Sequence, residues 1–154
     1  MPLRDVLLAV LVVAIWGFNF VVIKVGVADV PPLLLTGLRF LFAALPAVFF
    51  VKRPACAWHW VVAFGLVLGV VKFGLLFTAM KLGMPAGLSS LVLQMQAFFT
   101  MALAFLLLGE RPLGVQIVGA AIAAVGVGVI ASTRSGAGTA FGPFLMVLAA
   151  AACW

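Results

Sequence analysis

Residues 7 to 27, LLAVLVVAIWGFNFVVIKVGV, form an almost unbroken apolar run, and this run decides the fold class of the chain. As an α-helix rising about 1.5 Å per residue, a run of about 21 residues spans the roughly 30 Å hydrocarbon core of a bilayer. The run is longer than the apolar part of a signal peptide and lacks an Ala-x-Ala cleavage site, so we interpret it as an uncleaved span. A shift of 138 residues sets Leu7 on Leu145 and Trp16 on Trp154, which suggests that a related segment begins near residue 145.

The composition extends this interpretation to the whole chain. Hydrophobic residues make up 68% of the sequence, charged residues only 8%, and the mean hydropathy is +1.42. Soluble domains are about half apolar and about a quarter charged. The charges lie mostly between apolar runs, as expected of loops that meet water, so the sequence predicts an all-α integral membrane protein. The net charge is +6, but the basic residues form no stripe along the sequence, which argues against nucleic-acid binding.

The apolar runs divide the chain into segments of membrane-spanning length. The expected spans lie at about 7–27, 33–51, 61–80, 88–108 and 115–131. Residues 1–134 would thus form one five-helix repeat, and 135–140 a loop. Residues 141–154 give a helix of about 21 Å, too short to cross the bilayer, so we expect the truncated start of a sixth helix. Five spans place the ends of the repeat on opposite sides, so a second repeat would enter with inverted topology.

The orientation follows from the loop charges. Lysines and arginines on the N-terminal side slightly outnumber those on the other side: Arg4, Lys52, Arg53 and Arg111 against Lys24, Lys81 and Arg134. The positive-inside rule therefore favours a cytoplasmic N-terminus.

Lys72 is the sharpest single signal, because a charge near the bilayer midplane is costly and usually faces a cavity, a partner or a pathway. Gly65 and Gly69 lie on the same helical side, and such small residues favour close helix packing. One interpretation is that Lys72 attracts a substrate carboxylate. The alternative, weighted equally, is a structural lysine that reaches an interface or bonds backbone carbonyls.

Other polar residues within the spans are weaker candidates for lining a cavity. Arg39 is either a substrate contact or an interfacial anchor. Trp16 and Asn19 lie three residues apart, so they share one side of a helix. Ser90 and Gln94 share a side in the fourth span, and we prefer them to Gln96, which points about 200° away from Gln94. Each of these polar side chains could equally join helices to one another.

A Gly-Pro-Gly break separates the third and fourth spans. Gly83, Pro85 and Gly87 lie within five residues of one another, and glycine and proline both interrupt helices. We expect a hinge or a half-helix boundary there.

The sequence offers no catalytic or metal-binding set. The spans contain no Asp or Glu in their apolar interiors, and His59 has no acidic neighbour in the sequence. Cys56 and Cys153 lie at unrelated depths, which argues against a disulfide or redox pair. We therefore expect no cofactor, no metal and no enzymatic activity.

Several motifs together resemble the EamA family of drug/metabolite transporters. They are Trp16-Gly-Phe-Asn-Phe, Pro32 with Arg39-Phe40, Gly83-Met-Pro-Ala-Gly, and Gly109-Glu-Arg-Pro followed by Gln116 and Gly119. Within the family, residues 20–26 and 90–100 are most similar to bacterial exporters of O-acetylserine and cysteine. The resemblance implies ten helices in two inverted five-helix repeats, a central cavity and alternating access. Lys72 departs from the neutral residue that the family would lead us to expect.

The leading hypothesis is a secondary transporter that exports small amino-acid metabolites, with Lys72 attracting their carboxylate. Its partners would be the bilayer, the substrate, and a second repeat or another copy of the chain. Efflux of lipophilic cations is an alternative, although a buried lysine would repel them. A further alternative is a membrane scaffold without transport activity, or an inactive fragment. Polar substitutions in a scaffold would change stability or partner recovery without a substrate-specific loss of flux.

Overall fold

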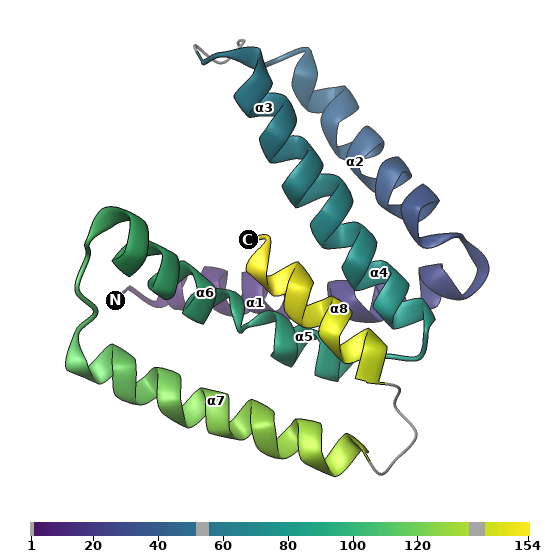
Figure 1. The fold of residues 1–154 in the computed structure, drawn as a ribbon. Coiled ribbons are helices and arrows are strands. Elements are labelled where there is room, and N and C mark those ends of the chain that lie inside the picture. The colour runs from purple at the N-terminus through teal and green to yellow at the C-terminus, as the bar shows by residue number, and fades with distance from the viewer. Residues whose placement is uncertain (1, 52–55, 136–140) are drawn as a thin grey trace.

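The structure is a computed structural model that describes residues 2–51, 56–135 and 141–154. These residues form helices and no strands, which confirms the predicted all-α fold (Figure 1). The α-helices are α1 (Leu3–Asp29), α2 (Pro32–Val48), α3 (Trp58–Phe64), α4 (Phe73–Lys81), α5 (Ala86–Leu93), α6 (Gln96–Leu103), α7 (Gly114–Ser135) and α8 (Phe141–Ala152). Two π-helical segments, η1 (Gly65–Lys72) and η2 (Ala104–Leu108), continue α3 into α4 and extend α6.

Prolines set the boundary between the first two helices. Helix α1 ends at Asp29, and α2 begins at Pro32, whose missing N–H would have no partner in a first helical turn.

A side-chain hydrogen bond joins α1 to α4: Lys24 of α1 donates to the carbonyl of Met80, in the last turn of α4. The end of a helix leaves such carbonyls without intrahelical partners, so this bond ties α1 to α4.

Three helices are long and apolar enough to cross a membrane by length and composition. They are Leu3–Asp29, with a mean hydropathy of 2.8, Trp58–Lys81 with 2.3, and Ala86–Leu108 with 2.0. Shorter apolar helices cover Pro32–Val48, Gly114–Ile130 and Phe141–Ala152. Large apolar side chains are exposed along most of these helices, as expected of surfaces that meet lipid or further protein.

The helix from Ala86 to Leu108 is not regular throughout. At Gln94 and Met95 the backbone N–H groups bond the carbonyls three residues back, Leu91 and Val92, instead of four. The N–H groups of Ala97 and Phe98 repeat this pattern. Such tighter turning advances side chains by about 120° per residue instead of about 100°. The sides presented by α5 and α6 therefore differ from those of one continuous α-helix.

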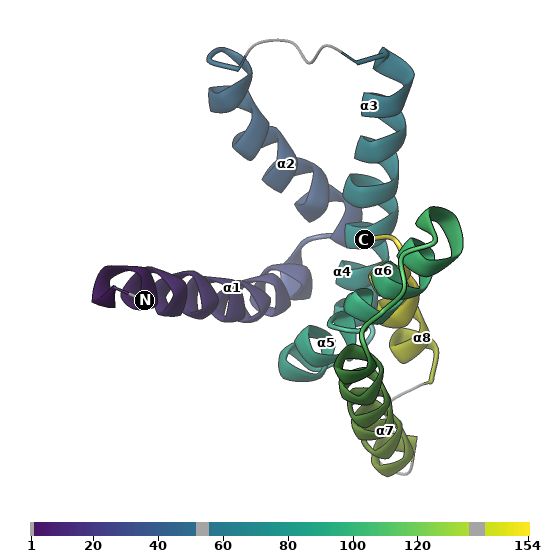
Figure 2. The same cartoon turned by 90° about the vertical axis from the view of Figure 1, so that its left-hand side faces the viewer.

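The core lies where α4 and α8 pack along each other, flanked by α1, α2 and α5. Its fully buried members include Phe77 and Met80 of α4 and Val147 and Ala150 of α8. Figure 2 shows α1 running outward from this centre, while α2 and α3 rise together on another side. Helix α7 lies along the edge of the molecule (Figure 1).

Some sequence predictions fall outside the described residues. Of the predicted loop at 135–140, Ser135 is the last residue of α7, and residues 136–140 lie outside the described part of the chain. Lys52 and Arg53, which enter the orientation argument, also lie outside it. The division into repeats stays a prediction.

Candidate functional site

Lys72 lies at the end of η1 and is fully buried, with an exposed fraction of 0%. Its Nζ has no hydrogen-bond partner. Its neighbours are aromatic: Nζ lies 3.0 Å from the ring centroid of Trp154 and 5.2 Å from that of Phe73. The buried ammonium is thus held against π faces, with its hydrogen-bonding capacity unused.

Trp154 connects Lys72 to the first helix. Its ring centroid lies 6.5 Å from that of Trp16 on α1, with the ring planes at 53°. Both indoles are about half exposed, 49% for Trp16 and 54% for Trp154. Two segments that the 138-residue shift aligns in the sequence therefore place their tryptophans side by side.

Trp16, Asn19 and Arg39 share a cavity of about 470 Å³, which Val12 and Ile15 complete. The Arg39 guanidinium lies 5.7 Å from the ring centroid of Phe73 and 6.0 Å from that of Phe77. Phe73 therefore contacts the cations of both Arg39 and Lys72. The three acids of the chain are Asp5 and Asp29, near the two ends of α1, and Glu110, in the loop after η2.

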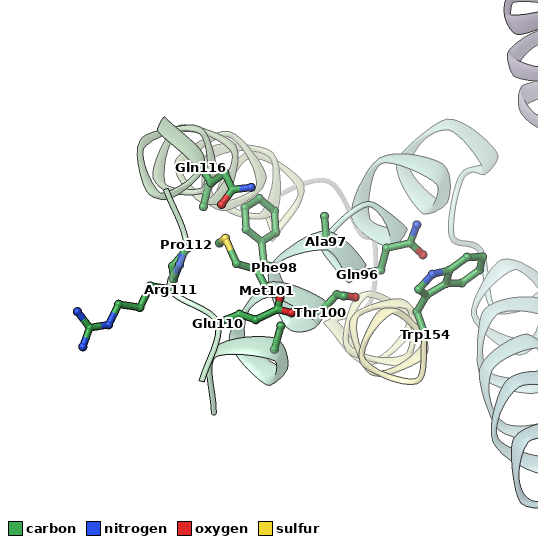
Figure 3. Close-up of a pocket in the computed structure, with 12 residues that line it drawn as sticks. Gln96, Ala97, Phe98, Thr100, Met101, Glu110, Arg111, Pro112, Gln116 and Trp154 are labelled. Carbon is green, nitrogen blue, oxygen red and sulfur yellow. The ribbon is translucent and has the colours of Figure 1, made fainter. Parts of the chain in front are cut away.

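A larger cavity of about 720 Å³ lies between α6, the loop after η2 and α7 (Figure 3). Its polar lining comes from Gln96, Thr100, Glu110, Arg111 and Gln116, and Trp154 closes one end. Figure 3 shows the Gln96 amide beside the Trp154 indole, while the Arg111 guanidinium points away from the cavity. Oε1 of Gln96 is buried without a hydrogen-bond partner.

Ser90 and Gln94 lie away from this arrangement. The Ser90 hydroxyl donates to the carbonyl of Gly87 at 2.8 Å, within its own helix. Gln94 is exposed and lines a separate apolar cavity of about 240 Å³ between the α5–α6 region and α7. Gln96, two residues further along, lines the larger cavity together with Trp154.

The residues of the predicted hinge fall in two settings. Gly83 lies between α4 and α5 with a φ of +106°, a conformation that residues with a side chain rarely adopt. Pro85 directly precedes α5, and Gly87 lies inside it. Their role in motion stays a prediction.

Sequence reasoning did not select three residues that line the larger cavity, Trp154, Gln96 and Thr100. Gln96 and Thr100 are four residues apart, a spacing that puts both on one side of a helix and could have identified them. The alignment of Trp16 with Trp154 carried a further signal, but it did not say that the two would meet.

The described residues hold no group of three or more His, Cys, Asp or Glu side chains that could bind a metal ion. Cys56 and Cys153 are free thiols. The site is therefore described by two cations, a set of aromatic rings and neutral amides.

Residues 3–132 match the EamA-like transporter family. The chain belongs to this family. Over its whole length it is 51% identical to a protein of Salmonella typhimurium and 49% identical to one of Escherichia coli, both named probable amino-acid metabolite efflux pump. It is also 29% identical, over 96% of its length, to the uncharacterized inner membrane transporter YedA of Escherichia coli.

The chain spans about half the length of these relatives, 52% of each efflux pump and 49% of YedA. No solved structure matches the chain.

Proposed function

We propose that this protein is a secondary transporter that exports small amino-acid metabolites, similar to cysteine and O-acetylserine, across the inner membrane by alternating access. The observation that carries the proposal is the identity of about one half, over the whole chain, to proteins named as amino-acid metabolite efflux pumps. The similarity to an inner membrane transporter supports the location. A cytoplasmic N-terminus remains part of the proposal.

Two neighbouring cations support a substrate with a carboxylate. Lys72 is buried and Arg39 is exposed, and both lie close to the ring of Phe73. An anion that reached the buried Lys72 would meet a positive charge in a medium of low dielectric constant, where electrostatic attraction is strong. In this proposal Lys72 attracts the carboxylate, and Arg39, Trp16 and Asn19 shape the neighbouring cavity. Contributions from Ser90 and Gln94 stay a prediction.

The proposed transporter needs a second half. Its relatives are about twice as long, and the described helices expose apolar side chains on most of their length. We propose that a second repeat, or another copy of the chain, covers these surfaces and closes the cavities. The break at Gly83 and Pro85 would then be one place where the backbone changes direction during the transport cycle.

Efflux of lipophilic cations is the competing transport function. Lys72 and Arg39 would repel such substrates, and the described spans carry no carboxylate in their apolar interiors to attract them. The family and the names of the relatives favour a transporter over an enzyme, and over a scaffold without transport.

Uptake of radiolabelled O-acetylserine into everted membrane vesicles tests the proposal. Vesicles with the protein, expressed from its whole gene, should take up the label faster than vesicles without it. Lys72→Ala should reduce the initial rate about ten- to hundredfold, because a charge-assisted contact contributes about 1.5–3 kcal/mol.

The matched control is Lys81→Ala, which removes an exposed lysine at the end of α4 and should leave the rate near that of the wild type. Unchanged uptake in Lys72→Ala would remove Lys72 from the mechanism. Equal uptake with and without the protein would contradict the proposed function itself.

A further inference from the structure

Two buried polar atoms without hydrogen-bond partners belong to residues near Trp154. The Lys72 Nζ lies 3.0 Å from the ring centroid of Trp154, and Gln96 lines the same cavity as Trp154 (Figure 3). Both Lys72 Nζ and Gln96 Oε1 are buried, and neither has a hydrogen-bond partner. A buried polar group without a partner is unfavourable, more so when it is charged. Two such groups near one residue indicate a place that a polar ligand completes.

The two atoms have complementary chemistry. The ammonium of Lys72 is a positively charged donor without acceptor capacity, whereas the amide oxygen of Gln96 only accepts. An α-amino acid zwitterion carries the opposite pair, a carboxylate that accepts and an ammonium that donates, on one carbon atom. A small ligand that took the place of the indole would meet both protein groups.

Trp154 borders the cavity of about 720 Å³, which offers the indole a position away from Lys72. A carboxylate can accept more than one charge-assisted hydrogen bond from the ammonium, and such bonds are stronger than neutral ones. A carboxylate ligand can therefore compete with the ring for the Lys72 ammonium.

We infer that Trp154 covers a binding site for α-amino acid zwitterions, in which Lys72 binds the carboxylate and Gln96 accepts a hydrogen bond from the α-ammonium. Trp154 is the positioning residue: it holds the lysine side chain while the site is empty and moves into the larger cavity when a ligand binds. The inference deepens the proposed function and rests on it, and it adds Trp154 and Gln96 to the site.

Three thiols of similar size separate the two contacts. L-Cysteine has both charged groups, L-cysteine methyl ester lacks the carboxylate, and 3-mercaptopropionate lacks the ammonium. Binding of each is measured by calorimetry under reducing conditions, on the purified protein expressed from its whole gene. Lys72→Met should weaken the binding of cysteine and 3-mercaptopropionate about ten- to hundredfold and leave the affinity for the ester unchanged. Gln96→Leu should weaken the binding of cysteine and the ester and leave the affinity for 3-mercaptopropionate unchanged.

Two further variants serve as controls for folding and for charge. Lys72→Arg keeps the cation and should keep the preference for carboxylates, and Lys81→Met should bind all three ligands like the wild type. Cysteine should also change the tryptophan emission of the wild type, and Trp154→Phe should abolish that change.

The ligand profiles decide between the possible outcomes. The inference would be overturned if Lys72→Met and Lys72→Arg both lost binding of all three ligands to the same extent. It would also be overturned if Lys72→Met and Gln96→Leu bound the three ligands like the wild type. If the wild type transports cysteine in either of those cases, the proposed function still stands. A wild-type protein that neither binds nor transports these ligands would overturn both.

Discussion

At the residue scale, the free-energy cost of burying the Lys72 ammonium is larger than the stabilisation by one contact with an aromatic ring. Removing an ion from water costs several kcal/mol even after the protein relaxes, whereas a desolvated cation–π contact contributes about 2 kcal/mol or somewhat more. Neither Trp154 nor Phe73 offers the amine a hydrogen-bond acceptor along the measured contacts, which run to the ring faces. The proposed role with an anionic ligand would account for a lysine in this position.

Phe77 shows the opposite case, a residue whose contribution is packing. It is fully buried at the centre of the core and meets Phe73 edge to face at 5.9 Å between centroids. Phe77→Ala should lower the free energy of unfolding by about 3 kcal/mol, because the cavity loses dispersion contacts. Unfolding in sodium dodecyl sulfate, followed by circular dichroism, measures this change. Phe18→Ala is the control: Phe18 is 67% exposed, and its loss should change the free energy by less than about 0.5 kcal/mol.

At the element scale, departures from regular helix decide which side chains meet. The hydrogen bonds from Gln94 and Met95 to carbonyls three residues back tighten the turn between α5 and α6. Sequence periodicity correctly separates Gln94 from Gln96 but does not say which of the two faces a cavity. Gln96, and not Gln94, lines the cavity that Trp154 also lines, and this depends on the packing of α6 near α8. No residue pattern in the chain signals that turn.

Two glycines beside α5 give an element-scale prediction. Gly83 has a φ of +106°, whereas Gly87 lies within the helix, and an added Cβ at either position would meet no atom within 4 Å. Gly83→Ala should therefore destabilise the protein by about 1–2 kcal/mol through backbone strain alone. Gly87→Ala should be neutral or stabilising by up to about 1 kcal/mol. Equal effects of the two changes on detergent unfolding would contradict the assigned backbone conformation.

At the scale of the whole molecule, the sequence predicted the class of protein better than the arrangement of its site. Hydropathy and length were sufficient for an all-α membrane protein, because the bilayer restricts which chains can cross it. The position of Lys72 within an apolar run likewise identified it as a candidate functional residue. Its contact with Trp154, 82 positions along the chain, depends on the packing of α4 against α8. Periodicity carries no information about such long-range packing.

Those long-range contacts bring the aligned residues Trp16 and Trp154 together, and Trp154 also lies against the buried Lys72. These residues form one side of the candidate site, while apolar surfaces around it are exposed. The relatives, which are about twice as long, indicate where the remaining wall comes from under the proposed function.

Competition for transport tests the central claim, export of amino-acid metabolites, most directly. The measurement is the initial rate of radiolabelled L-cysteine uptake into everted vesicles, with unlabelled O-acetylserine or the lipophilic cation tetraphenylphosphonium as competitor. The buried Lys72 predicts that O-acetylserine suppresses the protein-dependent uptake while tetraphenylphosphonium at the same concentration leaves it unchanged. Suppression by the cation alone, or the absence of any protein-dependent uptake, would contradict the account.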